Sequence, residues 1–268
     1  MNSTWVLDEP QPPPDARIAY GEGPHRFGEL RLPAGPGPHP VVVFVHGGFW
    51  RAMYGLEHAG HLCADLTRRG FATWSLEFRR VGHAGGGYPG TLEDVAAGLD
   101  HLRVMAPSRG LDLSRVVVMG HSAGGQLAMW LAARSRLQPG QPLYAAAPLR
   151  FRGVVSLAGV VDLEQGVARR LGDGAVAAFV GEGAPDLAAR YAVASPAMLQ
   201  PLPVPQVLVH GTVDDTVPVE MSDAFHTRGR ALGAPITYVR LEGTGHYELI
   251  DPRSQEWPRV MEALQSLL

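Results

Sequence analysis

The sequence is poor in cysteine, and it lacks long basic runs and long apolar runs. Cys63 is the only cysteine among the 268 residues, so no disulfide can form within the chain. The formal net charge is −3 and no basic cluster stands out, which argues against nucleic acid or an anionic membrane as a partner. No segment has the length and apolarity of a membrane-spanning helix.

The first ten residues, Met1–Pro10, have neither the basic start nor the apolar stretch of a signal peptide. These features predict a cytoplasmic protein. Apolar residues make up 46% of the chain, enough for a sizeable buried core. We therefore expect a single domain over residues 1–268.

Apolar runs alternate with helical patterns along most of the chain. The candidate strands are Val41–Val45, Phe71–Phe78, Arg115–Met119, Gly153–Leu157, Gln206–Val209 and Ile236–Leu241. The candidate helices cover residues 55–69, 91–105, 122–136, 219–232 and 253–267. This alternation is typical of an α/β protein with a doubly wound, mostly parallel sheet that has helices on both faces.

Two segments depart from this rhythm. Residues 1–32 form an N-terminal arm in which Ala16–Tyr20 and Phe27–Leu32 are expected to pair as an antiparallel hairpin. Residues 162–203 are rich in alanine and end in a proline-rich stretch. We interpret them as a small helical cap inserted over the sheet edge, with a plain helical excursion as the alternative.

The segment Gly120-His121-Ser122-Ala123-Gly124-Gly125 lies between an apolar run and a helical pattern. A Gly-x-Ser-x-Gly motif between a strand and a helix forms a tight turn that exposes the serine hydroxyl at the carboxyl edge of a sheet. Ser122 is therefore a candidate nucleophile. A chance match, with the serine serving only as a turn residue, is the weaker interpretation in this context.

A serine hydroxyl needs a base to take its proton and a carboxylate to orient that base. Asp214 follows the strand that ends near Val209, and His246 follows the last strand. Because parallel strands end at the same edge of a sheet, we expect both side chains to lie near Ser122.

The glycine-rich loop His46-Gly47-Gly48-Phe49-Trp50 follows the first long strand. Acyl transfer places negative charge on a carbonyl oxygen, and backbone N–H groups aimed at that oxygen stabilise it. The N–H of Ala123 is one expected donor, and this loop is expected to supply a second.

Together these motifs resemble those of α/β-hydrolase-fold serine hydrolases, over roughly residues 25–268. The loop at residues 46–50 is similar to that of the esterase and kynurenine formamidase (arylformamidase) branch. The pattern from His210 to Pro218 is similar to the acid loop of this branch and of prolyl-oligopeptidase-like domains. The resemblance favours Asp214 over Asp215 as the acid.

The resemblance also implies roles for the site residues. Ser122 would be the nucleophile and His246 the base, with the second oxyanion donor at Gly48 or Phe49. The formamidase branch more often carries tyrosine at position 49. Residues adjoining the motifs could line a substrate pocket; they are His46, Gly47, Trp50 and Tyr247.

Other polar residues are given structural interpretations. His58 and His61 are spaced as metal ligands could be, but without further ligands we expect a solvated helix face and no metal. Arg79 and Arg80 are expected to pair with acids of the protein itself rather than with a substrate carboxylate. His121 is expected to be a structural hydrogen-bonding residue.

The sequence thus predicts a serine hydrolase that needs no metal or other cofactor. Its substrate would be a small carboxylic ester or an activated amide, cleaved through an acyl-enzyme. Arylformamidase is the first alternative and a small oligopeptidase-like hydrolase the second. A non-catalytic binding protein is the least favoured, because the serine, the histidine and the glycine loop are all present.

Overall fold

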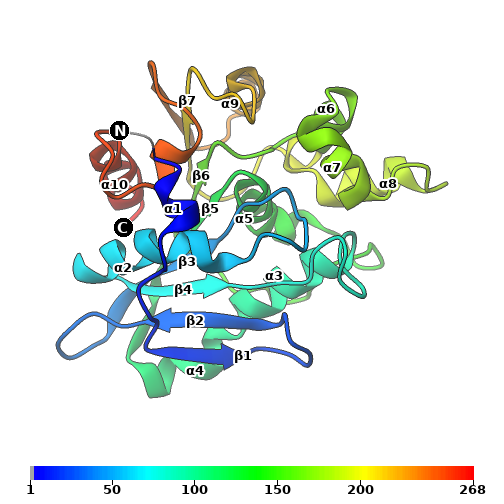
Figure 1. Ribbon diagram of the computed structural model, residues 1–268. Helices are drawn as coiled ribbons and strands as arrows, with labels where there is room; N and C mark the ends of the chain where they lie inside the picture. The colour runs from blue at the N-terminus through cyan, green and yellow to red at the C-terminus, as the bar shows by residue number, and fades with distance from the viewer. Residues whose placement is uncertain (1–2) are drawn as a thin grey trace.

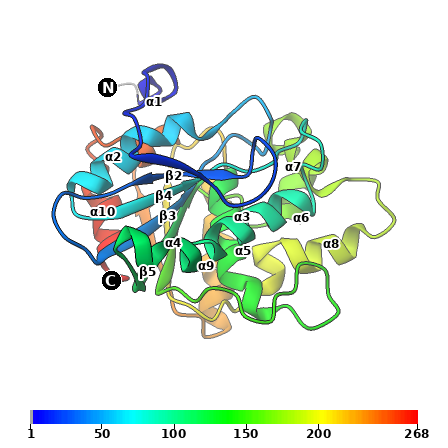
Figure 2. The ribbon, with the colours of Figure 1, turned by 90° about the horizontal axis from the view of Figure 1, so that it is seen from below.

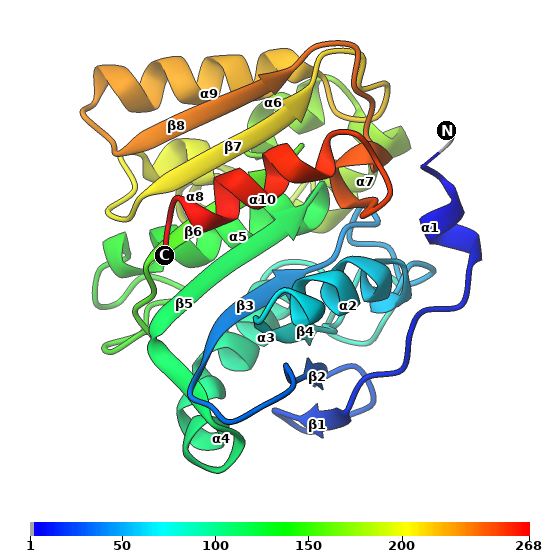
Figure 3. The same cartoon turned by 90° about the vertical axis from the view of Figure 1, so that its left-hand side faces the viewer.

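The computed structural model describes residues 3–268, so the first two residues of the predicted N-terminal arm lie outside the described part. Its centre is one eight-stranded sheet in the order β1-β2-β4-β3-β5-β6-β7-β8 (Figures 1 and 3). The strands are β1 (Ala16–Ala19), β2 (Phe27–Arg31), β3 (His39–Val45), β4 (Ala72–Leu76), β5 (Leu111–His121), β6 (Gly153–Leu157), β7 (Gln206–Gly211) and β8 (Ile236–Leu241).

The sheet is mostly parallel. All pairs from β4 through β3 to β8 are parallel, whereas β1 pairs with β2, and β2 with β4, in antiparallel register. The predicted hairpin is therefore present and extends the sheet at one edge. Because β3 to β8 run in one direction, their carboxyl ends meet along a single edge of the sheet.

Helices cover both faces of the sheet (Figures 2 and 3). The α-helices are α1 (Trp5–Asp8), α2 (Gly60–Arg68), α3 (Gly90–Asp100), α4 (Leu102–Arg109), α5 (Ala123–Ala133), α6 (Leu163–Ala168), α7 (Leu171–Val180), α8 (Leu187–Ala194), α9 (Val219–Ala231) and α10 (Trp257–Gln265). The 3₁₀ helices are η1 (Leu56–Ala59), η2 (Arg134–Arg136), η3 (Pro196–Leu199) and η4 (Tyr247–Ile250).

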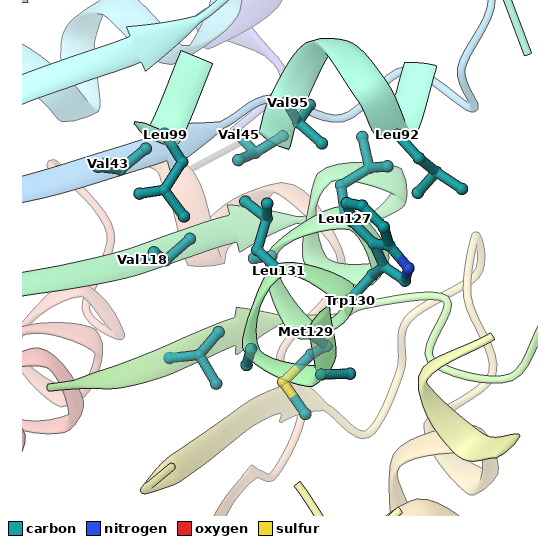
Figure 4. Close-up of a cluster of buried hydrophobic side chains, with 14 of the residues drawn as sticks. Val43, Val45, Leu92, Val95, Leu99, Val118, Leu127, Met129, Trp130 and Leu131 are labelled. Atoms are coloured by element: carbon teal, nitrogen blue, oxygen red, sulfur yellow. The ribbon is translucent and has the colours of Figure 1, made fainter. Parts of the chain in front are cut away.

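Each face of the sheet has its own core, because successive side chains of a strand point to opposite faces. Val41, Val43 and Val45 of β3 belong to one core with residues of α3, α4, α5 and α9. Figure 4 shows Val43 and Val45 beside side chains of α3 and α5. Val42 and Phe44 of the same strand pack with α2 and α10. The uninterrupted apolar runs of the sequence are thus strands buried on both sides.

Some predicted boundaries are wrong. The helix expected over residues 91–105 is two helices, α3 and α4, and the strand expected over Arg115–Met119 is the longer β5. Leu99 before the break and Leu102 after it are both buried in the same core. The apolar spacing therefore continues across the break and could not show it.

Residues 162–203 contain three short α-helices, α6 to α8, and the 3₁₀ helix η3. They lie together beside the sheet, at the right of Figures 1 and 2. The start of α7 is irregular, since Gly172, Asp173 and Gly174 have positive φ angles. Within residues 3–268, no helix combines the length and the apolarity needed to cross a membrane.

Candidate active site

Ser122 lies at the turn between β5 and α5, with φ 57° and ψ −121°. This conformation is rare for a residue with a side chain and is held by close packing around the turn. A Cβ at position 124 would overlap the carbonyl oxygens of Val45 and His46, so only glycine fits there. The motif therefore forms the strained turn predicted from the sequence.

His246 and Asp214 come together in the loops after β8 and β7. His246 Nδ1 lies 2.6 Å from Asp214 Oδ2, and both side chains are almost fully buried. The neighbouring Asp215 instead accepts a hydrogen bond from the Thr216 hydroxyl over 3.1 Å. Of the two adjacent carboxylates, the one that contacts His246 is the one favoured by the sequence resemblance.

Several donors hold the Asp214 carboxylate in its charged form. Oδ1 accepts the backbone N–H groups of Thr216 and Val217, each over 2.8 Å. His210 Nε2 lies 3.3 Å from Oδ2. Burial raises the pKa of Asp214, but the hydrogen bonds from His210 and His246 outweigh it and hold this pKa well below its usual range. The acid beside His246 is therefore ionised at neutral pH.

Ser122 and His246 open onto one cavity of about 330 Å³. This volume is at the small end of the range for small-molecule sites. Its lining mixes polar and apolar side chains. The lining residues are Leu7, Gly48, Phe49, Arg51, Tyr54, His58, His121, Ser122, Gly172, Asp173, Thr216, His246 and Tyr247.

The glycine-rich loop after β3 reaches this cavity through Gly48 and Phe49. Gly48 has φ 103°, and Phe49 and Trp50 also have positive φ angles, so three consecutive residues form a left-handed turn. The N–H groups of Gly48 and Phe49 donate to no acceptor among residues 3–268. This loop and the first turn of α5 at Ala123 flank Ser122.

Of the residues expected to line a substrate pocket, Tyr247 lines this cavity, whereas Trp50 and His46 do not. The Trp50 ring stacks on Phe179 at 4.5 Å and belongs to the core, because the left-handed turn points it inward. His46 is fully buried, with Nε2 3.4 Å from the Glu77 carboxylate. Gly47 contributes only backbone next to Ser122 and does not line the cavity.

His121 lines the cavity beside Ser122 and ties two loops together. Its Nε2 donates to the backbone carbonyl oxygen of His246 over 3.0 Å. Burial, and then the nearby His246, lower the pKa of His121 well below its ordinary value, so its ring is neutral. The hydrogen-bonding role expected for His121 agrees with this contact.

The expectation of a solvated face for His58 and His61 is wrong for His58. That ring is mostly buried, lines the cavity and lies edge-on to His46 at 5.7 Å. His61 instead packs against Trp5. Among residues 3–268, no three His, Cys, Asp or Glu side chains are grouped so that they could hold a metal ion.

The two arginines after β4 have partners within the protein. Arg79 binds Asp94 through Nε at 2.7 Å, and Arg80 lies 3.2 Å from Glu77. Sequence reasoning missed Leu7, Arg51, Tyr54, Asp173 and Thr216 as cavity residues. These residues come from the N-terminal arm and from irregular segments, where no periodic pattern indicates which way a side chain points.

A mostly parallel eight-stranded sheet, helices on both faces and a serine turn after β5 define the α/β-hydrolase fold. Residues 30–228 match the BD-FAE family, and the chain belongs to this family.

The chain is also similar to proteins named as esterases. It is 28% identical over 262 residues to esterase LipC of Mycobacterium tuberculosis, covering 88% of this chain and 60% of that protein. It is 26% identical to a probable isoprenylcysteine alpha-carbonyl methylesterase of Arabidopsis thaliana, ICMEL1, covering 87% of this chain and 50% of the relative. The chain thus spans only 50% to 60% of the length of these two relatives.

Among solved structures, esterase B from Lactobacillus rhamnosis has a similar fold. The TM-score is 0.78, and the match covers 98% of this chain and 87% of that one. The sequence identity is 21%, so this likeness concerns the fold alone.

Proposed function

We propose that this protein is a serine hydrolase that cleaves small carboxylic esters through an acyl-enzyme. The observation that carries the proposal is the 2.6 Å contact between His246 Nδ1 and Asp214 Oδ2 beside the strained Ser122 turn. Ser122 and His246 also line the same cavity. A buried base, an ionised acid and a serine that opens onto a cavity are the parts that serine acyl transfer requires.

The hydrogen bond to Asp214 keeps a proton on His246 Nδ1 and leaves Nε2 free to accept one. In the first half-reaction, Nε2 takes the proton of Ser122 Oγ as this oxygen attacks the ester carbonyl carbon. The carbonyl oxygen becomes negative, and the N–H groups of Ala123 and of Gly48 or Phe49 stabilise it.

Collapse of the tetrahedral intermediate breaks the bond to the alcohol oxygen, which takes the proton from His246 Nε2. The acyl group then remains on Ser122. Water adds to this acyl group with His246 again accepting the proton, and the second collapse returns the proton to Ser122 and releases the acid.

This mechanism removes the serine proton with an imidazole and uses no metal ion. Dialysis against EDTA is therefore expected to leave ester hydrolysis unchanged. Loss of activity on dialysis, with recovery on added zinc, would contradict this part of the proposal.

Ester hydrolysis is favoured over the arylformamidase and oligopeptidase alternatives. The names of the relatives support an ester, and Phe49 lacks the hydroxyl that tyrosine would bring to the formamidase-like position. A panel of p-nitrophenyl esters measured beside N-formylkynurenine and a short peptide substrate separates the three. Faster turnover of N-formylkynurenine than of any ester would favour the formamidase.

A fluorophosphonate probe tests the nucleophile directly. It is expected to add once, at Ser122, and Ser122→Ala is expected to lose both labelling and ester hydrolysis. Ser156→Ala is the matched control, since Ser156 is also buried, on the neighbouring strand β6. Full ester hydrolysis by Ser122→Ala, or labelling lost in the control instead, would overturn the proposal.

A further inference from the structure

The N-terminal helix α1 contributes a side chain to the cavity of the proposed active site. Leu7 lines this cavity and is 47% exposed, whereas its neighbour Val6 is 1% exposed and belongs to the core beneath α2 and α10. Figure 3 shows α1 on the side of the molecule toward which the parallel strands point. One face of this short helix is thus buried, and the other presents Leu7 to the cavity mouth.

The arm that carries Leu7 is anchored to the segment that follows His246. Ser3 Oγ and Trp5 Nε1 both donate to Asp251 Oδ2, over 2.7 and 2.9 Å. Asp251 is fully buried and directly follows η4, which begins right after His246. The arm is therefore anchored to the segment that immediately follows the proposed catalytic base, His246.

Further contacts hold the residues on either side of Leu7 in the sequence. The guanidinium of Arg253 lies 3.5 Å from the centre of the Trp5 ring and pairs with Glu9 at 2.9 Å. His61 packs edge-on against the same tryptophan at 4.7 Å. With residues 3, 5, 6 and 9 all in contact with the body of the protein, Leu7 has a defined position at the cavity mouth.

We propose that Leu7 is a specificity-determining residue that contacts the alkyl chain of the substrate. This inference rests on the proposed ester hydrolysis. The other residues of the cavity mouth are largely polar or aromatic, so the half-exposed leucine offers aliphatic surface that a passing methylene chain would bury. Each methylene buried there contributes about 0.8 kcal/mol, or about fourfold in kcat/KM.

The experiment compares Leu7→Ala with wild type on two substrate series. One series varies the acyl chain of p-nitrophenyl esters from acetyl to hexanoyl, and the other varies the alcohol of alkyl acetates from methyl to hexyl. The quantity measured is the ratio of kcat/KM for the longest and shortest members. Leu7→Ala is expected to lower this ratio about four- to fifteenfold in one series, and that series identifies the chain that Leu7 contacts.

Leu232→Ala is the matched control, because Leu232 has the same 47% exposure and does not line the cavity. It is expected to leave both ratios unchanged. Trp5→Phe removes the donor to Asp251 but keeps the ring, and by loosening the arm it is expected to lower the same ratio as Leu7→Ala.

Ratios in Leu7→Ala that match the control, or that rise above wild type, would overturn the inference. Such a result leaves the proposed function intact when wild type still hydrolyses esters and reacts with the fluorophosphonate. If wild type does neither, the proposed function itself fails, so the two failures are distinguishable.

Discussion

His121, the residue before Ser122, donates a hydrogen bond from Nε2 to the backbone carbonyl oxygen of His246 over 3.0 Å. The two rings lie 4.4 Å apart. The turn that carries the proposed nucleophile is thus tied to the loop that carries the proposed base. This contact fixes the distance between the two loops without using the imidazole of His246, which stays free to bind Asp214.

The first prediction concerns this contact. His121→Phe keeps a ring but removes the donor, and we expect kcat for a short ester to fall about fivefold, since one hydrogen bond contributes about 1 kcal/mol. His121→Gln, which can place an amide N–H near the Nε2 position, is expected to recover most of the activity. If His121→Phe were as active as His121→Gln, the hydrogen bond would not position His246.

The second prediction separates the adjacent carboxylates. Asp214→Asn is expected to lower kcat by about 10⁴, because the amide no longer stabilises the charged imidazole or fixes its tautomer. Asp215→Asn is the matched control and is expected to change kcat little, since Asp215 contacts Thr216 and not His246. Steady-state kinetics of both variants on one ester decides the assignment, which is wrong if Asp215→Asn is the crippling change.

The third prediction concerns acid stability. Burial, and then the neighbouring His46, lower the pKa of His58 to about 3 in the folded protein. In the unfolded chain a histidine titrates near 6.5, so between these values only the unfolded state binds the proton. The free energy of unfolding therefore falls as the pH drops below about 6.5, and buried His121 acts in the same direction.

His58→Gln removes one of the two histidines that bind a proton only when the protein unfolds. The loss of unfolding free energy between pH 6 and pH 5 is expected to shrink by about 1 kcal/mol, measured by urea denaturation at each pH. His61→Gln is the control, because the His61 ring packs on Trp5 and does not line the cavity. An unchanged pH dependence in His58→Gln would contradict the role of His58.

The fourth prediction concerns substrate size. The cavity of about 330 Å³ is lined in part by Gly172 and Asp173 of a short helical segment rich in alanine, which offers little continuous aliphatic surface for a long chain. We expect kcat/KM to be highest for acetyl to butyryl esters and to fall by octanoyl. A profile that rises from octanoyl to dodecanoyl, or activation at a lipid–water interface, would contradict this expectation.

The sequence by itself determined the sheet and the local geometry of the site motifs. Continuous apolar runs such as Val41–Val45 are typical of strands buried on both faces, and the structure places them so. The glycines around Ser122 determine the backbone conformation of this turn, because any side chain at position 124 would overlap the neighbouring strand. The order serine, aspartate, histidine, each after a strand, brought the three to one edge of the sheet.

Only the tertiary structure decided what surrounds Ser122. The pattern at residues 46–50 did not show that Trp50 turns into the core while Phe49 lines the cavity, because consecutive positive φ angles reverse the usual alternation. The arm that carries Leu7 is held in place by the contact of Trp5 with Asp251, far along the chain, and His58 lies edge-on to His46. Periodicity reports which face of a segment is buried, but packing between distant segments decides which side chains meet in a cavity.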